Sequence, residues 1–180
     1  MVYPKTIVGR FVKLKSITLD DAEFSYSIRS DERFSKTVGQ PAKSLEEQKR
    51  FIEWQMKEPN DYYFVVFNRN DERIGLIGVY DIHGDMAEFG REVNCASSVE
   101  AIEAEILVND FAIDVLGIKR FCHVIYADNK KHLKNQEKLG LKPVKKVIRS
   151  GVESFYYEGY LTKDEKRRKL LAKVKDDFLD

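Results

Sequence analysis

The sequence lacks a long apolar run and any cysteine motif. No apolar run approaches the roughly 20 residues that a helix needs to cross a bilayer, so we expect no membrane-spanning segment and no membrane partner. The stretch MVYPKTIVGR has no long apolar core and no evident cleavage site, so we expect no secretory signal. Cys95 and Cys122 show no metal-ligand spacing, which predicts reduced thiols and no metal site. A cytoplasmic protein is the resulting expectation.

An excess of charge of one sign is also absent. The chain has 31 Lys and Arg against 30 Asp and Glu, a formal net charge of +1. A nucleic-acid-binding protein normally shows a basic excess, so we expect no nucleic-acid partner. A length of 180 residues with 43% hydrophobic residues suits one compact domain over residues 1–180, with no linker or internal repeat.

The apolar pattern changes between short β-type runs and helical spacing, which predicts an α/β chain. Strands are expected at 9–17, 62–67, 74–80, 86–93, 121–126, 144–148 and 154–161. Helices are expected at 19–30, from Leu45 to just before Pro59, at 99–116, at 129–139 and after Thr162. The range 31–43 is predicted to be a loop, and Thr162 with Glu165 reads as a capping box for the last helix.

The stretch from Gly117 to Pro143 carries the most information. An apolar strand ends at the polar turn ADNKK, where Asp128 or Asn129 can cap the following helix. The helix is expected to run through Leu139 and to stop at Gly140, the usual residue type after a helix C-terminus.

This stretch resembles the C-terminal half of the GNAT superfamily of N-acetyltransferases, and the ribosomal-protein N-acetyltransferase branch most of all. Asn129, His132 and the sequence Glu137-Lys138-Leu139-Gly140-Leu141 stand at the family's motif positions. His132 replaces the usual Ser, Leu141 the usual Phe, and Gln136 stands where many members carry a Tyr. The resemblance is strongest over 9–161. It implies a mixed central sheet of about six to seven strands flanked by helices, in the order β-α-α-β-β-β-α-β-α-β-β, followed by a C-terminal helix.

The resemblance implies acetyl-CoA as co-substrate, with its pyrophosphate at the turn between a strand ending near Val93 and a helix starting near Val99. The family signature there is Arg or Gln, two residues, Gly, one residue, then Gly or Ala. Ala96, Val99 and Ala101 occupy these places, and only Ala101 conforms. Ser97 and Glu100 form a capping-box pattern that would use N–H groups needed by a phosphate. The candidate coenzyme-binding residues are Val93, Cys95, Ser97, Ser98, Val99, Ala101 and Asn129.

Two residues are candidates for the proton transfers of acetyl transfer. Glu88 is the expected base, because relatives use carboxylates on this strand, often through water. Glu92 is the second choice and is expected on the same strand face. His132 is the expected acid or cation for the thiolate. The alternatives are solvent-facing carboxylates, a surface histidine and, for Asn129, a plain helix cap.

The sequence therefore predicts an N-acetyltransferase in which a primary amine attacks acetyl-CoA directly within a ternary complex. A protein N-terminus, an amino sugar and another small amine all remain open as acceptors. The alternative is a non-catalytic binding or scaffold protein that keeps the fold and has lost acetyl-CoA binding, which the missing glycines of the 94–101 turn would explain. The resemblance also allows a homodimer, because relatives often pair through strand edges or C-terminal elements.

Overall fold

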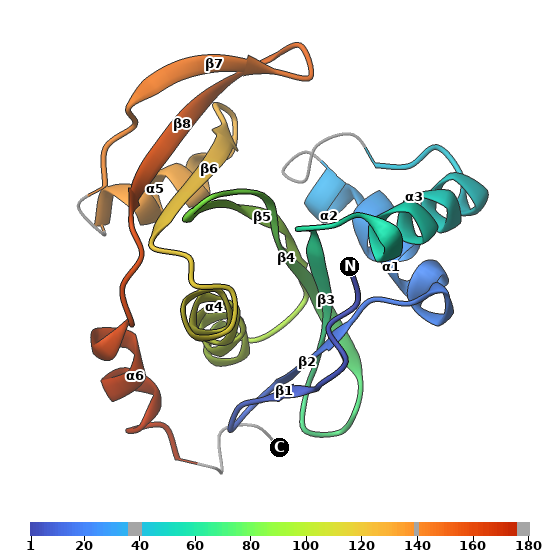
Figure 1. Ribbon diagram of the computed structural model, residues 1–180, viewed down its shortest axis with the longest axis horizontal. Helices are drawn as coiled ribbons and strands as arrows, with labels where there is room; N and C mark the ends of the chain where they lie inside the picture. The colour runs from blue at the N-terminus through green and yellow to red at the C-terminus, as the bar shows by residue number, and fades with distance from the viewer. Residues whose placement is uncertain (36–40, 139–140, 176–180) are drawn as a thin grey trace.

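The computed structural model describes residues 1–35, 41–138 and 141–175, and these build one mixed sheet in the order β1-β2-β3-β4-β5-β6-β8-β7 (Figure 1). Its strands are β1 (Ile7–Val8), β2 (Lys13–Ser16), β3 (Tyr62–Phe67), β4 (Arg73–His83), β5 (Met86–Asn94), β6 (Arg120–Tyr126), β7 (Lys145–Arg149) and β8 (Val152–Tyr160). The helices are a 3₁₀ helix (Leu19–Asp21), α1 (Ala22–Ser30), α2 (Glu32–Ser35), α3 (Leu45–Lys57), α4 (Ser98–Asp114), α5 (Lys130–Lys138) and α6 (Glu165–Leu171).

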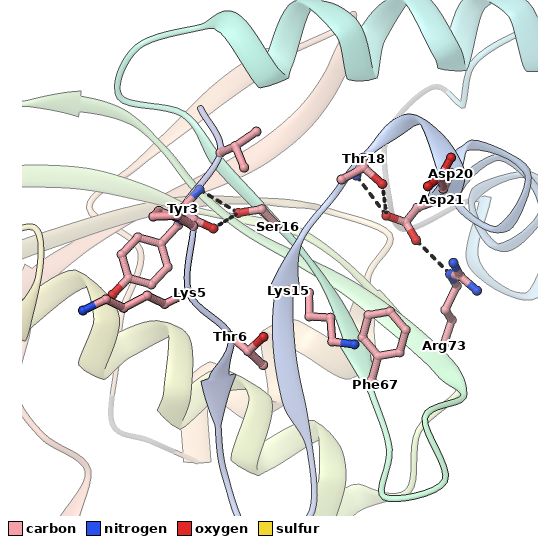
Figure 2. A pocket seen from close by; sticks show the side chains of 12 residues that line it. Tyr3, Lys5, Thr6, Lys15, Ser16, Thr18, Asp20, Asp21, Phe67 and Arg73 are labelled. Atoms are coloured by element: carbon pink, nitrogen blue, oxygen red, sulfur yellow. Dashed lines mark hydrogen bonds and ion pairs between the residues drawn. The ribbon is translucent and has the colours of Figure 1, made fainter.

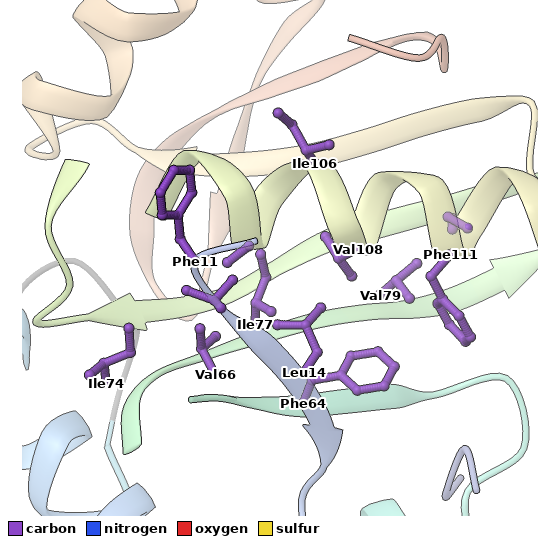
Figure 3. Close-up of a cluster of buried hydrophobic side chains, with 14 of the residues drawn as sticks. Phe11, Leu14, Phe64, Val66, Ile74, Ile77, Val79, Ile106, Val108 and Phe111 are labelled. Atoms are coloured by element: carbon purple, nitrogen blue, oxygen red, sulfur yellow. The ribbon is translucent and has the colours of Figure 1, made fainter. Parts of the chain in front are cut away.

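Helices cover both faces of the sheet (Figure 1). The larger apolar cluster lies between the sheet and α4, where Phe111 meets the rings of Tyr3, Tyr62 and Phe64 at centroid distances of 4.8, 5.2 and 5.2 Å (Figure 3). The opposite face packs a second cluster against α1 and α3, with Ile52 among its fully buried members. Burial of so much apolar surface on both faces is the main stabilising contribution to this fold.

A buried carboxylate from α4 fixes the chain between β1 and β2. Glu103 is 7% exposed and accepts backbone N–H groups from Arg10 at 2.9 Å, Phe11 at 2.5 Å and Val12 at 2.8 Å. A buried N–H group must find an acceptor somewhere, and here one side chain supplies it for three successive residues. Phe11 and Val12 are therefore buried without belonging to a strand.

β5 carries a bulge that changes which side chains face which way. Leu76 pairs with Val93 and Gly78 with Gly90, so three steps on β5 oppose two on β4. The extra residue is accommodated at Arg91, whose φ of 53° lies in the left-handed region. β5 pairs in parallel with β6 at only three positions, the last being Glu88 with Cys122, after which β6 continues alone against β8.

The predicted α/β architecture and its order of elements are confirmed, with some corrections. The described part of the sheet has eight strands instead of about six to seven, because two-residue β1 is too short to show alternation. The predicted strand at 9–17 shrinks to Lys13–Ser16, since the preceding N–H groups bind Glu103. α2 lies inside the predicted loop 31–43, of which 36–40 fall outside the described residues, as do Leu139 and Gly140.

The expectation that Thr162 and Glu165 form a capping box at the last helix is wrong. Asp164 is the N-cap of α6, and its side chain accepts from the Arg167 backbone N–H at 2.8 Å. The same carboxylate also pairs with the Arg167 guanidinium, which a threonine at the cap could not do. This second interaction favours Asp164 over Thr162.

Candidate functional site

The candidate site lies where β5 and β6 part. Beyond the Glu88–Cys122 pair, no register pair joins these two fully described strands. Backbone N–H and C=O groups of β5 that would face β6 are therefore left without a strand partner, while the other edge of β5 stays paired with β4. An exposed strand edge of this kind can hydrogen-bond an extended ligand along its length.

Glu88 stands at this branch point and is 9% exposed. Its Oε1 accepts from the Tyr80 hydroxyl at 2.9 Å and is also ion-paired with Nη1 of Arg149, which comes from β7. Tyr80 is directly opposite Glu88 in the β4–β5 register. Burial, followed by the charge of Glu88, raises the pKa of Tyr80, so this hydroxyl stays a donor at neutral pH.

The bulge places Arg91 on the same face as Glu88. Its guanidinium lies 3.9 Å from the Tyr80 ring centroid and its Nη1 is 2.7 Å from Asp61 Oδ1. A Cβ at Gly90 would come within 2.8 Å of the Tyr80 hydroxyl oxygen, so only glycine there lets Tyr80 reach Glu88 unhindered. Tyr80, Glu88 and Arg91 thus form one continuous polar surface on the α1–α3 side of the sheet.

Glu92 is on the opposite face, and the expectation that it shares a face with Glu88 is wrong. The extra residue at Arg91 breaks the period-2 alternation, so Glu92 turns toward Glu105 of α4 and Arg167 of α6. Burial, together with the charge of Glu105, raises the pKa of Glu92 to about 8. Glu105 itself is ion-paired with Arg167.

This raised pKa predicts a pH-dependent stability. A carboxyl group whose pKa rises from 4.5 to about 8 on folding binds its proton more tightly in the folded state. Its contribution is complete below about pH 4.5 and is lost as the pH rises to about 8. Urea denaturation gives the change in the free energy of unfolding between pH 5 and pH 8. The decrease over this range should be smaller in Glu92→Gln than in the wild type, by at least about 1 kcal/mol.

The difference between the two proteins is the quantity to measure, because His123 and His132 titrate at about pH 6.5 in the unfolded chain and also make stability depend on pH. Burial lowers the pKa of both, that of His123 to about 4, so their contributions run in the opposite direction. Parallel pH profiles for wild type and Glu92→Gln would contradict the assignment to Glu92.

α5 carries the second group of predicted residues. The Oδ1 of Asn129 accepts from the His132 backbone N–H at 3.1 Å, so Asn129, of the two predicted candidates, caps this helix. Its side-chain NH₂ has no acceptor among the described residues. The His132 ring lies 6.1 Å from the ring of His123 in β6. Because burial lowers its pKa, His132 is mainly a neutral imidazole at pH 7.

Two buried polar atoms, one on β6 and one on α5, have no hydrogen-bond partner among the described residues. They are Nε2 of His123 and Oε1 of Gln136, the latter on a side chain only 7% exposed. Buried polar atoms are normally satisfied, so such exceptions indicate a polar interior that a ligand or water can enter. His123 directly follows Cys122, the last residue of β6 that pairs with β5. Cys122, next to His123, is a less suitable nucleophile because burial raises its pKa.

The predicted capping box at the start of α4 is confirmed. Glu100 Oε2 accepts from the Ser97 backbone N–H at 2.9 Å and its hydroxyl at 2.8 Å, while Ser97 Oγ accepts from the Glu100 N–H at 3.3 Å. The N–H groups of Ser98 and Val99 have no such partner among the described residues and can still bind an anion. Glu100, however, puts a carboxylate where a pyrophosphate would lie.

The other predicted coenzyme residues differ in how accessible they are. The side chain of Val93 is buried in the second apolar cluster, so only its backbone can contact a ligand. The backbone N–H of Cys95 donates to the Ile74 carbonyl at 2.9 Å, and the Ala101 N–H to the Ser97 carbonyl at 3.0 Å. Their remaining contribution is therefore to shape the turn.

The two predicted catalytic residues lie on opposite faces of the sheet. Glu88 and Cys122 are paired and share a face, so the next residue, His123, points to the other face, where it meets His132. Sequence reasoning missed Tyr80 and Arg149. Tyr80 could have been found, because a hairpin closing at Gly84 places residues 80 and 88 opposite each other. No local pattern indicates Arg149.

A separate hollow of about 400 Å³ lies at the far end of β4 from Tyr80 (Figure 2). Its polar groups largely bind one another. Arg73 Nε donates to Asp21 Oδ1 at 2.8 Å, and the other oxygen of Asp21 accepts from Thr18. We therefore place the candidate site at the strand gap. In the described part of the chain, no helix is long and apolar enough to span a membrane, and no group of three or more His, Cys, Asp or Glu side chains is arranged to bind a metal.

The family model described as "Acetyltransferase (GNAT) domain" matches residues 12–142. No curated protein sequence matches the chain. Among solved structures, a GCN5-related N-acetyltransferase from Brucella melitensis superposes with a TM-score of 0.76 at 17% identity, over 99% of this chain and 89% of that one.

Two further solved structures have named substrates. The spermidine N-acetyltransferase from Vibrio cholerae in complex with CoA and spermine has a TM-score of 0.72 and 15% identity, over 84% of this chain and 96% of that one. A nucleotide-linked sugar GNAT, FdhC in its apo form, has a TM-score of 0.74 and 20% identity, over 94% and 98% of the two chains. At such identities the likeness shows the fold, and the acceptors of these proteins differ from one another.

Proposed function

The chain belongs to the GNAT acetyltransferase family, and we propose that it is an N-acetyltransferase that transfers the acetyl group of acetyl-CoA to a primary amine. The observation that carries this proposal is the position of Glu88. Its buried carboxylate stands at the last β5–β6 pair, beside a strand edge whose backbone groups have no strand partner. A base and a row of N–H donors are what direct attack of an amine on a thioester requires.

The residues around the gap divide this work between the two faces. Glu88 would take the proton of the attacking amine, directly or through water, on the α1–α3 side. Backbone N–H groups of β5 would polarise the thioester carbonyl. On the other side, the free amide NH₂ of Asn129 would bind the pantetheine arm, and His132 would donate a hydrogen bond to the leaving thiolate as a neutral imidazole.

The residues present fit the coenzyme in part. Acetyl-CoA supplies the acetyl group as an activated thioester when bound. Ser98 and Val99 offer N–H groups at the start of α4, whereas the Ser97–Glu100 box would have to open or share its donors. Isothermal titration of the purified chain with acetyl-CoA, with CoA as control, should give micromolar affinity. A folded protein by circular dichroism that gives no heat at millimolar ligand would overturn the proposal.

Glu100→Gln tests where the pyrophosphate binds. Removal of this carboxylate from the helix N-terminus should increase acetyl-CoA affinity about two- to five-fold, because a negative group beside a phosphate costs roughly 0.3–1 kcal/mol. Glu165→Gln, which removes a carboxylate from the first turn of another helix, α6, is the matched control and should leave affinity unchanged. Unchanged or weaker binding by Glu100→Gln would contradict pyrophosphate binding at this turn.

One observation favours a second candidate, a non-catalytic binding or scaffold protein with this fold. The closed capping box at Ser97–Glu100 already satisfies donors at the start of α4 that a bound pyrophosphate would need. The same titration separates the two candidates. The ribosomal-protein branch, the cytoplasmic location, a homodimer and the absence of nucleic-acid or membrane partners stay predictions.

A further inference from the structure

Arg149 occupies the position that an acceptor amine needs. Its Nη1 is ion-paired with Glu88 Oε1, the oxygen that also accepts from the Tyr80 hydroxyl. An ammonium group that is to lose its proton to Glu88 must come within hydrogen-bond distance of the same carboxylate. The Arg149 guanidinium and the ammonium group of the acceptor therefore compete for the Glu88 carboxylate.

Separation of Glu88 from Arg149 is unfavourable unless each of the two side chains gains a new partner of opposite charge. The Glu88 side chain is 11% exposed and that of Arg149 39% exposed, so the carboxylate in particular is shielded from water. Removal of one member of such a pair leaves an uncompensated charge. The amine of the acceptor replaces Arg149 at Glu88, but Arg149 then needs an anion of its own.

Arg91 lies on the same surface as Arg149 but already has an acidic partner. Its Nη1 donates to Asp61 Oδ1, and its Cζ lies 3.9, 5.7 and 5.4 Å from the ring centroids of Tyr80, Tyr63 and Phe51. Tyr80 thus has Arg91 over its ring and Arg149 at the carboxylate that its hydroxyl binds. Because Asp61 already matches the charge of Arg91, Arg149 is the cation that needs a new anion, and a carboxylate or phosphate fits its N–H donors, whereas a second positive charge in the acceptor would be repelled.

We propose that the acceptor is an amine that also carries a carboxylate or phosphate group, and that this group binds Arg149 when the amine displaces it from Glu88. The inference rests on the proposed acetyl transfer at this site. It makes Arg149 a residue that determines acceptor specificity. It also makes polyamines poor acceptors, although a structural relative is a spermidine N-acetyltransferase.

The test uses pairs of acceptors that differ only in the anionic group. They are alanine against alaninamide for a carboxylate and glucosamine 6-phosphate against glucosamine for a phosphate, with spermidine as the polycation. Thiol release from acetyl-CoA should give a kcat/KM at least ten-fold higher for the anionic member of one pair or both, and the pair that responds identifies the group. Equal or higher values for the neutral amines or spermidine would overturn the inference.

The variant Arg149→Gln should reduce the preference between paired acceptors to about one, mainly through a higher KM for the anionic member. Arg149→Lys should keep part of the preference, because lysine keeps the positive charge but lacks the paired N–H donors of the planar guanidinium. Arg120→Gln, an exposed arginine that pairs with Asp85, is the control and should keep the full preference. A merely structural Arg149 would instead reduce kcat/KM equally for both members of a pair.

Failure of this inference is distinguishable from failure of the proposed function. The same acceptor pairs are titrated calorimetrically into the chain with and without CoA. If acetyl-CoA does not bind, the acetyl-transfer proposal fails, yet an Arg149-dependent preference for the anionic amine would still support the specificity of the site. If acetyl-CoA binds and turns over with no anion preference, the acceptor inference alone is wrong.

Discussion

Glutamine at position 88 should reduce kcat about 10²- to 10⁴-fold and leave acetyl-CoA affinity nearly unchanged, since a positioned general base contributes an effect of that size. Glutamine keeps the shape of the side chain and can still accept from the Tyr80 hydroxyl, but it cannot take a proton from the acceptor. Steady-state thiol release gives kcat, and calorimetry gives the acetyl-CoA affinity. The large loss in kcat should persist across pH 6–9, because no protonation state restores the base.

Glu153→Gln is the matched control for this experiment. Glu153 lies on β8, is half-exposed and pairs with Lys146 at 3.0 Å, so its removal should change kcat less than two-fold. A Glu88→Gln protein with a kcat close to that of the wild type would show that Glu88 only holds Arg149. Equal losses in the two variants would indicate a general effect on folding.

The largest effect on stability is expected at Glu103. Glu103→Ala removes the acceptor of three backbone N–H groups, of which those of Phe11 and Val12 are buried. Buried donors left without a partner cost about 1–3 kcal/mol each, so the free energy of unfolding should fall by about 3–5 kcal/mol. Urea denaturation followed by circular dichroism measures this loss as a lower midpoint at unchanged m-value.

Glu53→Ala provides the comparison, because Glu53 is an exposed glutamate on α3. Its unfolding free energy should stay within about 0.5 kcal/mol of the wild type. Glu103→Gln should lie between the two, since one amide oxygen can still accept. A loss below about 1 kcal/mol in Glu103→Ala would mean that water replaces the carboxylate and that the 10–12 segment is not held by α4.

Most of the fold could be predicted because its elements have strong local signals. The hairpin strands β3 and β4 are apolar runs joined by a polar turn, and α3 and α4 begin at serines that cap them. What the sequence did not indicate depends on distant partners. The segment at Phe11 and Val12 looks like a strand until Glu103 takes its N–H groups, and β1 is too short to have a pattern.

The candidate site was predictable to a smaller extent for the same reason. Glu88 was identified through the resemblance, and the Ser97–Glu100 box through its spacing. The face of Glu92 was predicted wrongly, because a non-glycine residue in the left-handed region at Arg91 leaves no mark in the sequence. Arg149 lies 61 positions from Glu88, so only the arrangement of β7 across the sheet brings the two together.

The separation of β5 and β6 beyond Glu88 also divides the sheet into two units, which differ in how much of the buried apolar core they contain. Both apolar clusters draw their buried members from β2 to β5, from α1, α3 and α4, and from Phe11, Val12, Ile17, Ile118 and Leu171, and none from β6, β7 or β8. Local unfolding follows such boundaries, because segments with less shared core open at lower free energy. We therefore expect the three C-terminal strands to exchange amide hydrogens faster than the strands of the main core. Arg149 belongs to β7, so the position of its guanidinium at Glu88 depends on the three-strand unit that contains less of the buried core.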